Sequence, residues 1–445
     1  MVDLQGYRGP SLELLHRSQV SVGDSIVVET DDAIYEGVLM PRYEFADDRH
    51  IVIKLKNGYN IGIHIKRIKN IVRRAKKEDL HTVTPIPVSV NQNLPKVSIV
   101  STGGTIASRV DYRTGGVYPA LSASDLYTSV PELSQYAQID AEVLFNIYSE
   151  NIEVTHWEAM AMKVAEKVRE GFHGVVITHG TDTMGYTSAA LSFALLNVPI
   201  PVAIVGSQRS SDRPSSDAAL NLIGSVVLAA RAPFSGVYVV MHSSMNDDTL
   251  AVHLGTRVRK NHTSRRDAFE SIDTPPVAYI KDGSLEMVLN NLPLRRDDRE
   301  FNPRAKFDHR VALLKFHPGF DPSIIEYLTD RGYRGIVLEG TGLGHVSNKC
   351  FPALRKAIDR GVLVMMTSQC IWGRVRMTVY ETGRDLLNIG VIPLEGMLPE
   401  TALVKMMWVL AHTSNEEDAK RLMLTNLAGE FISRSPLKRR FNDGL

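Results

Sequence analysis

Between residues 20 and 72, hydrophobic and polar positions alternate in short runs. The runs SIVVET, IYEGVLMP, HIVIKLK and YNIGIHI are separated by polar breaks, one of which contains the pair Asn57-Gly58. Alternation with a period of two is typical of half-buried strands, and an Asn-Gly pair favours a tight hairpin turn. This region therefore predicts a small β-barrel.

A basic stretch and a polar, proline-containing segment follow the β-rich region. The first, KRIKNIVRRAKKED, is compatible with a helix, and the second, HTVTPIPVSVNQNLP, has the composition of an extended linker. We therefore expect a barrel domain with a basic extension over residues 1–80 and a linker over residues 81–95.

From Lys96 the pattern changes to apolar strands that are each followed by a helix-like run. The strand candidates are KVSIV, GVVIT, PVAIV and GVYVV. Strands that alternate with helices are typical of a parallel α/β sheet. After Val154 the apolar residues have helical spacing, Thr155 and Glu158 match a helix-capping pattern, and Gly171 supplies a stop.

A second and smaller α/β unit begins near Asp308. It has the strand candidates VALLK and GIVLEG, with the helical run SIIEYLTDRG between them. The charged segment NNLPLRRDDREFNPRAKFDHR precedes it and has the composition of an interdomain connection rather than a packed element. The sequence therefore predicts a two-domain parallel α/β core, with domains at 96–290 and 311–445 and a connection at 291–310.

Composition and charge narrow the classes of protein that this chain can represent. The 445 residues are 44% hydrophobic and 23% charged, as in globular proteins, and the formal net charge is only +1. Any contact with nucleic acid must therefore come from a local patch or from a partner protein. The simplest interpretation of basic clusters such as Arg265-Arg266 is that they lie on solvated faces of the protein. Two cysteines, no signal-peptide pattern and no stretch long enough to span a membrane predict a cytoplasmic protein.

Two strand-end turns carry the residues with candidate chemistry. KVSIV is followed by the turn STGGTIAS, which contains Thr105, and GVVIT is followed by HGTDT, which contains Thr181 and Asp182. In open parallel sheets, ligands bind at the carboxyl ends of strands. Taken singly, the first turn could be a tight connection or an anion-binding nest, and the second a capped helix N-terminus.

A threonine hydroxyl needs a neighbouring base and hydrogen-bond donors to attack an amide. A Thr-Asp pair with a lysine meets that need, and we favour Lys260 because it lies beyond the fourth strand of the same sheet. Spacing alone does not separate Lys260 from several other basic residues.

The two motifs TGGTIA and HGTDT, in this order and each after a strand, resemble those of the L-asparaginase family. The resemblance runs from Lys96 to about Ala411 and implies an asparaginase-like two-domain core. It also implies that Thr105 is the nucleophile and that Thr181, Asp182 and Lys260 form the second catalytic group. Asp182 would also hold the α-ammonium group of the substrate.

The same resemblance implies further site residues. A tyrosine should assist the nucleophile, and Tyr118 in GGVYPALS matches better than its rival Tyr112. Ser149 and Glu150 in NIYSENI would bind the backbone groups of the amino-acid substrate. No cofactor or metal is expected in this chain. The sequence departs from the family at Gly206-Ser207-Gln208-Arg209, which changes a pocket wall, and at His345, for which we favour a structural role.

The first 94 residues exceed what an asparaginase needs. A small barrel ahead of an asparaginase core resembles the D-type subunits of archaeal-type glutamyl-tRNA(Gln) amidotransferases. That resemblance implies glutamine hydrolysis here and transfer of ammonia to the E-type subunit, which would use ATP and Mg²⁺ and carry most of the contact with glutamate-charged tRNA(Gln). It also implies a homodimer within a heterotetramer. The alternatives are a free-standing cytoplasmic L-asparaginase and an RNA-binding barrel on an inactive scaffold.

Overall fold

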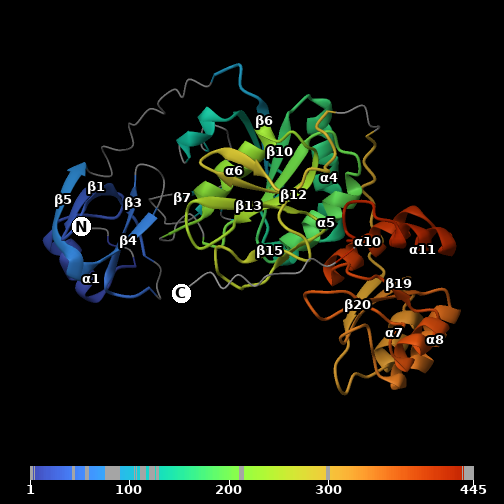
Figure 1. Cartoon of the computed structure of the whole chain (residues 1–445). Coiled ribbons are helices and arrows are strands. Elements are labelled where there is room, and N and C mark those ends of the chain that lie inside the picture. The colour runs from blue at the N-terminus through green and yellow to red at the C-terminus, as the bar shows by residue number, and fades with distance from the viewer. Residues whose placement is uncertain are drawn as a thin grey trace.

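The computed structural model describes most of the chain, and its residues form three domains in chain order (Figure 1). The described residues are 4, 6–42, 46–55, 60–75, 91–104, 106, 108–110, 117–119, 126, 130–209, 215–296, 301–432 and 434, with only the backbone described for 108–110 and 117–119. A small β domain comes first, a larger α/β domain lies in the middle, and a smaller α/β domain lies at its far side.

The N-terminal domain is one antiparallel sheet with a helix packed on it. Its elements are α1 (Gly9–Arg17), β1 (Ser25–Thr30), β2 (Ile34–Leu39), β3 (His50–Leu55), β4 (Asn60–His64), the 3-10 turn η1 (Ile65–Arg67) and β5 (Ile68–Ala75). The strand order is β4-β3-β2-β1-β5, and the predicted small β domain is confirmed. No pairing joins the edge strands β4 and β5 among the described residues, so closure into a barrel stays a prediction.

The basic stretch after this β-rich region was expected to suit a helix, and for residues 68–75 that expectation is wrong. These residues form β5, which pairs with β1 and places Ile71 opposite Val28. Ile71 is buried in the core of the domain, while Arg73 and Arg74 are exposed. Pairing with a neighbouring strand and burial of one face outweigh the weak helical preference of lysine and arginine.

An eight-stranded sheet forms the centre of the larger domain, in the order β17-β16-β13-β12-β11-β10-β6-β9. The strands are β6 (Lys96–Ser101), β9 (Gln138–Val143), β10 (Gly174–Thr178), β11 (Pro201–Val205), β12 (Gly236–His242), β13 (Thr249–Leu254), β16 (Ala278–Lys281) and β17 (Ser284–Met287). The four predicted strands β6, β10, β11 and β12 are parallel neighbours, as expected. The sheet is nevertheless mixed, because β13, β16 and β17 add an antiparallel edge.

Helices cover both faces of this sheet (Figure 1). Val175 and Ile177 of β10 belong to one buried cluster with residues of α4 (Val154–Arg169) and α5 (Met184–Ala194). Val176 belongs to the opposite cluster, with residues of α6 (Ala218–Arg231). A parallel strand buried on both faces needs a continuous apolar run, which is why GVVIT shows no polar alternation.

The cap of α4 differs from the predicted one. The helix begins after Glu153, whose side chain accepts from the backbone N–H of His156, while His156 Nδ1 accepts from the N–H of Glu153 at 2.9 Å. The predicted Thr155–Glu158 cap is therefore wrong by two residues, and the Glu158 carboxylate pairs with Lys306 instead. The predicted stop at Gly171 is confirmed, since this glycine has a φ of 83° just after the helix.

The smaller domain contains a parallel sheet in the order β18-β19-β20-β21. Its elements are β18 (Val311–Lys315), α7 (Ser323–Asp330), β19 (Gly335–Gly340), η4 (Asn348–Cys350), α8 (Phe351–Asp359), β20 (Leu363–Ser368), α9 (Glu381–Ile389), β21 (Ile392–Pro393), α10 (Pro399–His412) and α11 (Glu416–Leu424). The predicted strands β18 and β19 and the helix between them are confirmed. Helix α10 packs against α5 of the larger domain and so joins the two cores.

The segment between the two α/β domains is packed, unlike the loose connection that its charge suggested. The guanidinium of Arg295 donates to the carbonyl oxygens of Ala230 and His173, each at 2.9 Å. Phe307 is buried and its ring meets the ring of Trp157 edge-on, with centroids 5.6 Å apart. Residues 297–300 of this segment lie outside the described residues.

A buried ion pair fixes the segment that follows α11. Lys405 Nζ lies 2.5 Å from Glu430 Oε1, and both side chains are fully buried. Lys405 also donates to the carbonyl oxygen of Met423, and the Glu430 carboxylate accepts the backbone N–H of Ala428. Burial lowers the pKa of Lys405, and the nearby Glu430 opposes that shift. The pair holds this segment against the larger domain, where Arg257 donates to the carbonyl oxygen of Glu430.

We predict that Lys405→Met destabilises the protein by about 3–5 kcal/mol, because it leaves the Glu430 carboxylate buried without its cation. Lys420→Met is the matched control, since Lys420 pairs with Glu416 and Glu417 on the exposed side of α11 and should contribute less than about 1 kcal/mol. Denaturant unfolding of both variants measures the difference. Equal losses in the two variants would contradict the role given to the buried pair.

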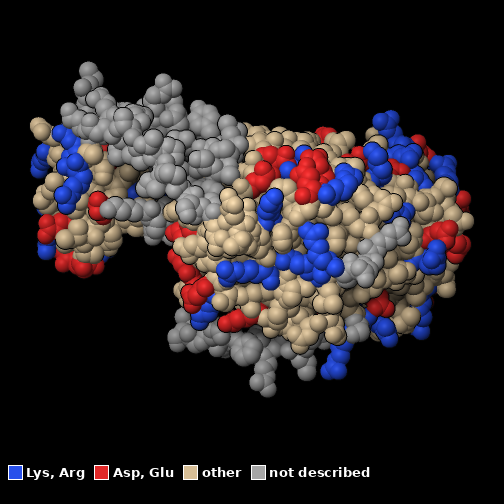
Figure 2. Space-filling model, turned by 90° about the horizontal axis from the view of Figure 1, so that it is seen from above, with Lys and Arg blue, Asp and Glu red and all other residues tan. Residues whose placement is uncertain are grey.

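The surface gives two further observations. No helix in the described ranges combines the length and the hydropathy needed to cross a bilayer. On the face drawn in Figure 2, lysine and arginine side chains form small groups with aspartate and glutamate between them. The described residues drawn on this face therefore form no single extended area of positive charge.

Candidate active site

Three of the predicted catalytic residues lie in contact at one end of the large sheet. Thr181 and Asp182 follow β10, and Lys260 ends β14 (Val258–Lys260). Lys260 Nζ donates to Thr181 Oγ1 at 2.8 Å and to Asp182 Oδ1 at 2.7 Å. Lys260 is 14% exposed and the Asp182 side chain 71% exposed. The lysine is thus enclosed, while the carboxylate faces open space.

A short hairpin brings Lys260 to this place. Strand β14 pairs antiparallel with β15 (Phe269–Ser271), and Lys260 lies opposite Phe269. The backbone N–H of Asn261 donates to the carbonyl oxygen of Ala268 at 2.7 Å, which closes the loop 261–268. Lys260 follows Thr181 by 79 positions in the sequence, and this hairpin brings the chain back to the same end of the sheet. Sequence spacing therefore could not select Lys260.

The turn after β6 packs directly on the turn after β10. Gly104 has a φ of 74°, and a Cβ at this position would lie 3.2 Å from the backbone nitrogen of Gly180. Gly103 has a φ of 124°, and a Cβ there would lie 2.0 Å from the carbonyl oxygen of Ile147. Only glycine tolerates both the backbone conformation and the lack of space. Thr105 lies outside the described residues, between Gly104 and the buried Ile106.

The predicted substrate-binding residues that follow β9 lie next to the second turn. Ser149 and Glu150 are in the 3-10 turn η3 (Ser149–Asn151). Ser149 is buried beside Gly180, where a Cβ would lie 2.8 Å from Ser149 Oγ, and its carbonyl oxygen accepts from Thr183 Oγ1. Glu150 is exposed.

The two tyrosines proposed to assist Thr105 remain untested. Tyr118 lies in β8 (Val117–Pro119), which pairs with β7 (Ser108–Val110), but its side chain is outside the described atoms. Tyr112 is outside the described residues.

The buried side chain of His179 supports the second turn. Sequence reasoning missed this role, although His179 is part of the HGTDT motif. His179 is fully buried, with Nδ1 2.6 Å from the carbonyl oxygen of Gly180 and Nε2 2.9 Å from Thr187 Oγ1. Thr187 Oγ1 also accepts from Trp157 Nε1. Nδ1 therefore carries the proton and Nε2 accepts the threonine hydroxyl. Burial lowers the pKa of His179 to about 4, so the ring is neutral near pH 7.

Comparison with known proteins assigns families to all three domains. Residues 96–292 match the model of the asparaginase N-terminal domain, and residues 310–423 match that of the glutaminase/asparaginase C-terminal domain. Residues 20–72 match the GatD N-terminal domain. A solved structure of the thermostable L-asparaginase from Thermococcus kodakarensis is 35% identical in sequence, with a TM-score of 0.68. The similarity covers 76% of this chain and 100% of the asparaginase chain.

Full-length relatives extend the similarity to the whole chain. The D-type subunit of the glutamyl-tRNA(Gln) amidotransferase of Pyrococcus abyssi is 50% identical over 426 residues, which are 94% of this chain and 96% of the relative. The corresponding subunit of Metallosphaera sedula is 48% identical over 438 residues, 98% of both chains. The chain belongs to the GatD family, the D-type subunits of glutamyl-tRNA(Gln) amidotransferases. The expected asparaginase-like core with an added N-terminal β domain is thereby confirmed.

In this member of the GatD family, residues 206–209, where the sequence departs from the L-asparaginase family, lie against the site. A Cβ on Gly206 would lie 2.9 Å from Thr181 Cγ2 and 2.7 Å from the carbonyl oxygen of His179. The buried Asp217 accepts the backbone N–H groups of Gln208 and Arg209 at 3.0 and 2.9 Å. Ser207 Oγ and Gln208 Nε2 are buried without a hydrogen-bond partner in the described part of the chain. Residues 210–214 lie outside it.

His345, the other departure, packs within the smaller domain. Its Nδ1 lies 3.1 Å from Thr382 Oγ1, and its ring meets that of Tyr380 edge-on with centroids 5.5 Å apart. These contacts agree with the structural role favoured from the sequence.

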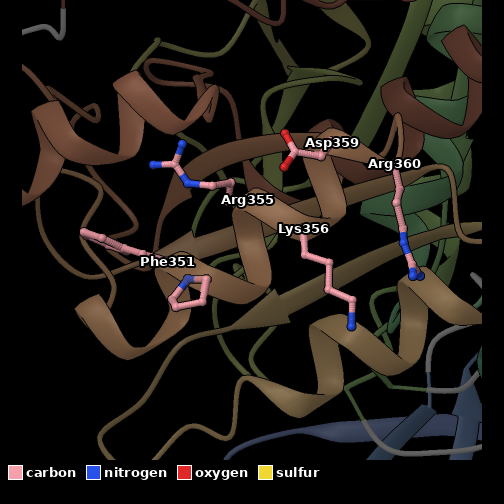
Figure 3. A pocket seen from close by; sticks show the side chains of 6 residues that line it. Phe351, Arg355, Lys356, Asp359 and Arg360 are labelled. Atoms are coloured by element: carbon pink, nitrogen blue, oxygen red, sulfur yellow. The ribbon is translucent and has the colours of Figure 1, made fainter.

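A surface hollow on α8 does not share the features of the site (Figure 3). Its lining consists of Phe351, Pro352, Arg355, Lys356, Asp359 and Arg360. Lys356 pairs with Glu326 at 3.6 Å, and Arg360 pairs with Asp330, so α7 neutralises both cations. The lining of the hollow contains none of the predicted catalytic residues.

We predict that the buried His179 makes stability depend on pH. Its folded pKa of about 4 lies below the ordinary 6.5, so its contribution is complete above pH 6.5 and is lost as pH falls toward 4. The loss should reach about 2 kcal/mol at pH 5. In denaturant unfolding at pH 7.5 and pH 5, His179→Gln should lose less stability on acidification than the wild type. His317→Gln, at an exposed position, should match the wild-type difference. An unchanged pH dependence in His179→Gln would contradict the assignment.

Proposed function

We propose that this chain hydrolyses the side-chain amide of glutamine and supplies the ammonia to a partner subunit that amidates glutamate on tRNA(Gln). The observation that carries the proposal is the contact of Lys260 Nζ with both Thr181 and Asp182, beside the glycine turn that leads into Thr105. Amide hydrolysis needs a hydroxyl nucleophile, a proton carrier and a site for the amino-acid head group. The two turns supply candidates for all three.

In the proposed reaction, Thr105 Oγ attacks the amide carbon of glutamine. The carbon–nitrogen bond breaks, ammonia leaves with the proton of the hydroxyl, and a γ-glutamyl ester remains on Thr105 until water hydrolyses it. Thr181 Oγ1 accepts a hydrogen bond from Lys260, which leaves its own O–H free to donate. Thr181, polarised by Lys260, is thus suited to exchange a proton with the reacting amide or with water. Tyr118 is proposed to assist Thr105 on its motif alone.

The substrate's charged head group has matching partners. The exposed Asp182 carboxylate and the exposed Glu150 suit an α-ammonium group, and the buried Ser149 lies beside them at the second turn. The unpartnered Ser207 Oγ and Gln208 Nε2 of the described structure lie on the wall next to Thr181 and suit a polar ligand.

The destination of the ammonia is proposed from the added N-terminal domain and from the relatives. Their name describes one subunit of a larger enzyme, the glutamyl-tRNA(Gln) amidotransferase. We propose that the E-type subunit, GatE, is the partner, that it uses ATP and Mg²⁺, and that it makes most of the contact with the tRNA. This chain needs no cofactor in the scheme. The net charge of +1 and the mixed charges in Figure 2 support a limited role in RNA binding.

We further propose a cytoplasmic enzyme that contains a homodimer of this chain within a heterotetramer. The two cysteines support a reducing compartment, since Cys350 and Cys370 are both free thiols. A free-standing L-asparaginase is the alternative, and the likeness to the Thermococcus kodakarensis enzyme favours it. The match of residues 20–72 to the GatD N-terminal domain favours the amidotransferase.

The test is the rate of ammonia release from glutamine by the chain co-expressed with GatE, with and without glutamyl-tRNA(Gln). We expect stimulation of at least about fivefold by the charged tRNA, the lower end of usual coupling between sites. A rate with glutamine or asparagine that ignores both the partner and the tRNA would favour the free-standing asparaginase.

Two threonine variants serve as controls in this assay. Thr105→Val should release no ammonia under any condition, whereas Thr155→Val, at an exposed position on α4, should behave like the wild type. Full activity of Thr105→Val would show that another residue is the nucleophile.

A further inference from the structure

Three buried polar residues link separate parts of the site without belonging to the proposed catalytic group. Asp217, Asn221 and His242 are each fully buried. Asp217 and Asn221 lie at the start of α6, and His242 ends β12. Buried polar groups cost stability unless their hydrogen bonds are made, so a connected set of them specifies one arrangement of the elements that carry them.

The first arm of this set holds the wall turn against Thr181. Asn221 Nδ2 donates to the carbonyl oxygen of Gly206 at 3.0 Å and to Asp217 Oδ2 at 2.9 Å. Asp217 in turn accepts the backbone N–H groups of Gln208 and Arg209. Gly206 is in close contact with Thr181. A shift of Asn221 would therefore move Gly206 and change its contact with Thr181.

The second arm reaches the hairpin that carries Lys260. Because Asn221 Nδ2 faces Asp217, its Oδ1 faces His242 Nδ1 at 2.7 Å. His242 Nε2 lies 3.2 Å from Asp247 Oδ1 in the turn between β12 and β13. Asp247 forms an ion pair with Arg266, which lies in the loop 261–268 between β14 and β15. Lys260 immediately precedes this loop.

We propose that Asp217, Asn221, His242, Asp247 and Arg266 form a positioning relay that sets the placement of Lys260 relative to Thr181. One arm fixes the wall behind Thr181 and the other fixes the hairpin of Lys260, and His242 joins them. The relay itself contains no residue that is proposed to bind the substrate. It rests on the proposed roles of Thr181 and Lys260, and its loss should lower kcat and leave KM nearly unchanged, because catalysis depends on alignment within about 1 Å.

The loop 261–268 offers a matched pair of arginines for the test. Arg266 is 14% exposed and pairs with Asp247, which lies 19 positions away in the chain. Arg265 is 52% exposed and, among the described residues, pairs only locally, with Asp267. Methionine retains most of the apolar stem of arginine and removes the charge. Arg266→Met thus breaks the relay, and Arg265→Met makes the same change beside it.

The experiment measures glutamine hydrolysis by the amidotransferase assembled with GatE. We expect Arg266→Met to lower kcat by about tenfold or more, with KM within about twofold of wild type, and Arg265→Met to match the wild type. Arg266→Lys should recover part of the loss. His242→Asn keeps a polar group at the Nδ1 position and loses the contact with Asp247, so it should lower kcat to a similar extent. Combining it with Arg266→Met should add little, since one relay is already broken.

The relay is wrong if Arg266→Met is as active as Arg265→Met, if it raises KM at unchanged kcat, or if the effects of His242→Asn and Arg266→Met multiply. Thr181→Val in the same assay separates this failure from a failure of the proposed function. An active Thr181→Val would overturn the proposed catalytic group itself. An inactive Thr181→Val together with an active Arg266→Met would overturn only the relay.

Discussion

The contact between two glycine turns is the constraint on which the candidate site depends. Strands β6 and β10 are parallel neighbours, so their carboxyl ends lie side by side. Gly104 and Gly180 then meet backbone to backbone, and a Cβ on Gly180 would lie 2.8 Å from Ser149. Side chains at these positions would push the two turns apart. The glycines form the contact between the two turns. Lys260 and Gly206 then make further contacts with Thr181 in the second turn.

The turns could be predicted from the sequence because each follows directly on a mainly apolar strand and contains a glycine break. Lys260 could not be selected in the same way. Its strand has three residues and pairs with another of three, which is too short to produce a periodic pattern. The edge strand β9 was missed although QIDAEV alternates polar and apolar residues, which is the pattern of a half-buried strand. The L-asparaginase resemblance, rather than periodicity, pointed to Lys260.

Local patterns failed where a distant partner decides the outcome. Arg265 and Arg266 are neighbours in the sequence, and both suggested a solvated basic face. Arg266 is the less exposed of the two and pairs with Asp247 from the turn after β12, while Arg265 pairs with Asp267 beside it. In the same way, Thr155 and Glu158 have the spacing of a cap, but the helix begins two residues earlier, where Glu153 and His156 bond each other. Secondary-structure propensity and motif spacing do not show which side chains or backbone groups these residues contact in the fold.

The central claim is that the threonine that follows this glycine junction attacks the amide. The most direct measurement is mass spectrometry of peptides from the assembled enzyme, quenched in acid within milliseconds of mixing with glutamine. The account predicts a γ-glutamyl ester on the peptide that contains Thr105, and its absence in the Thr105→Val variant. An ester on Thr181, or ammonia release with no ester on the Thr105 peptide at any time during turnover, would contradict it.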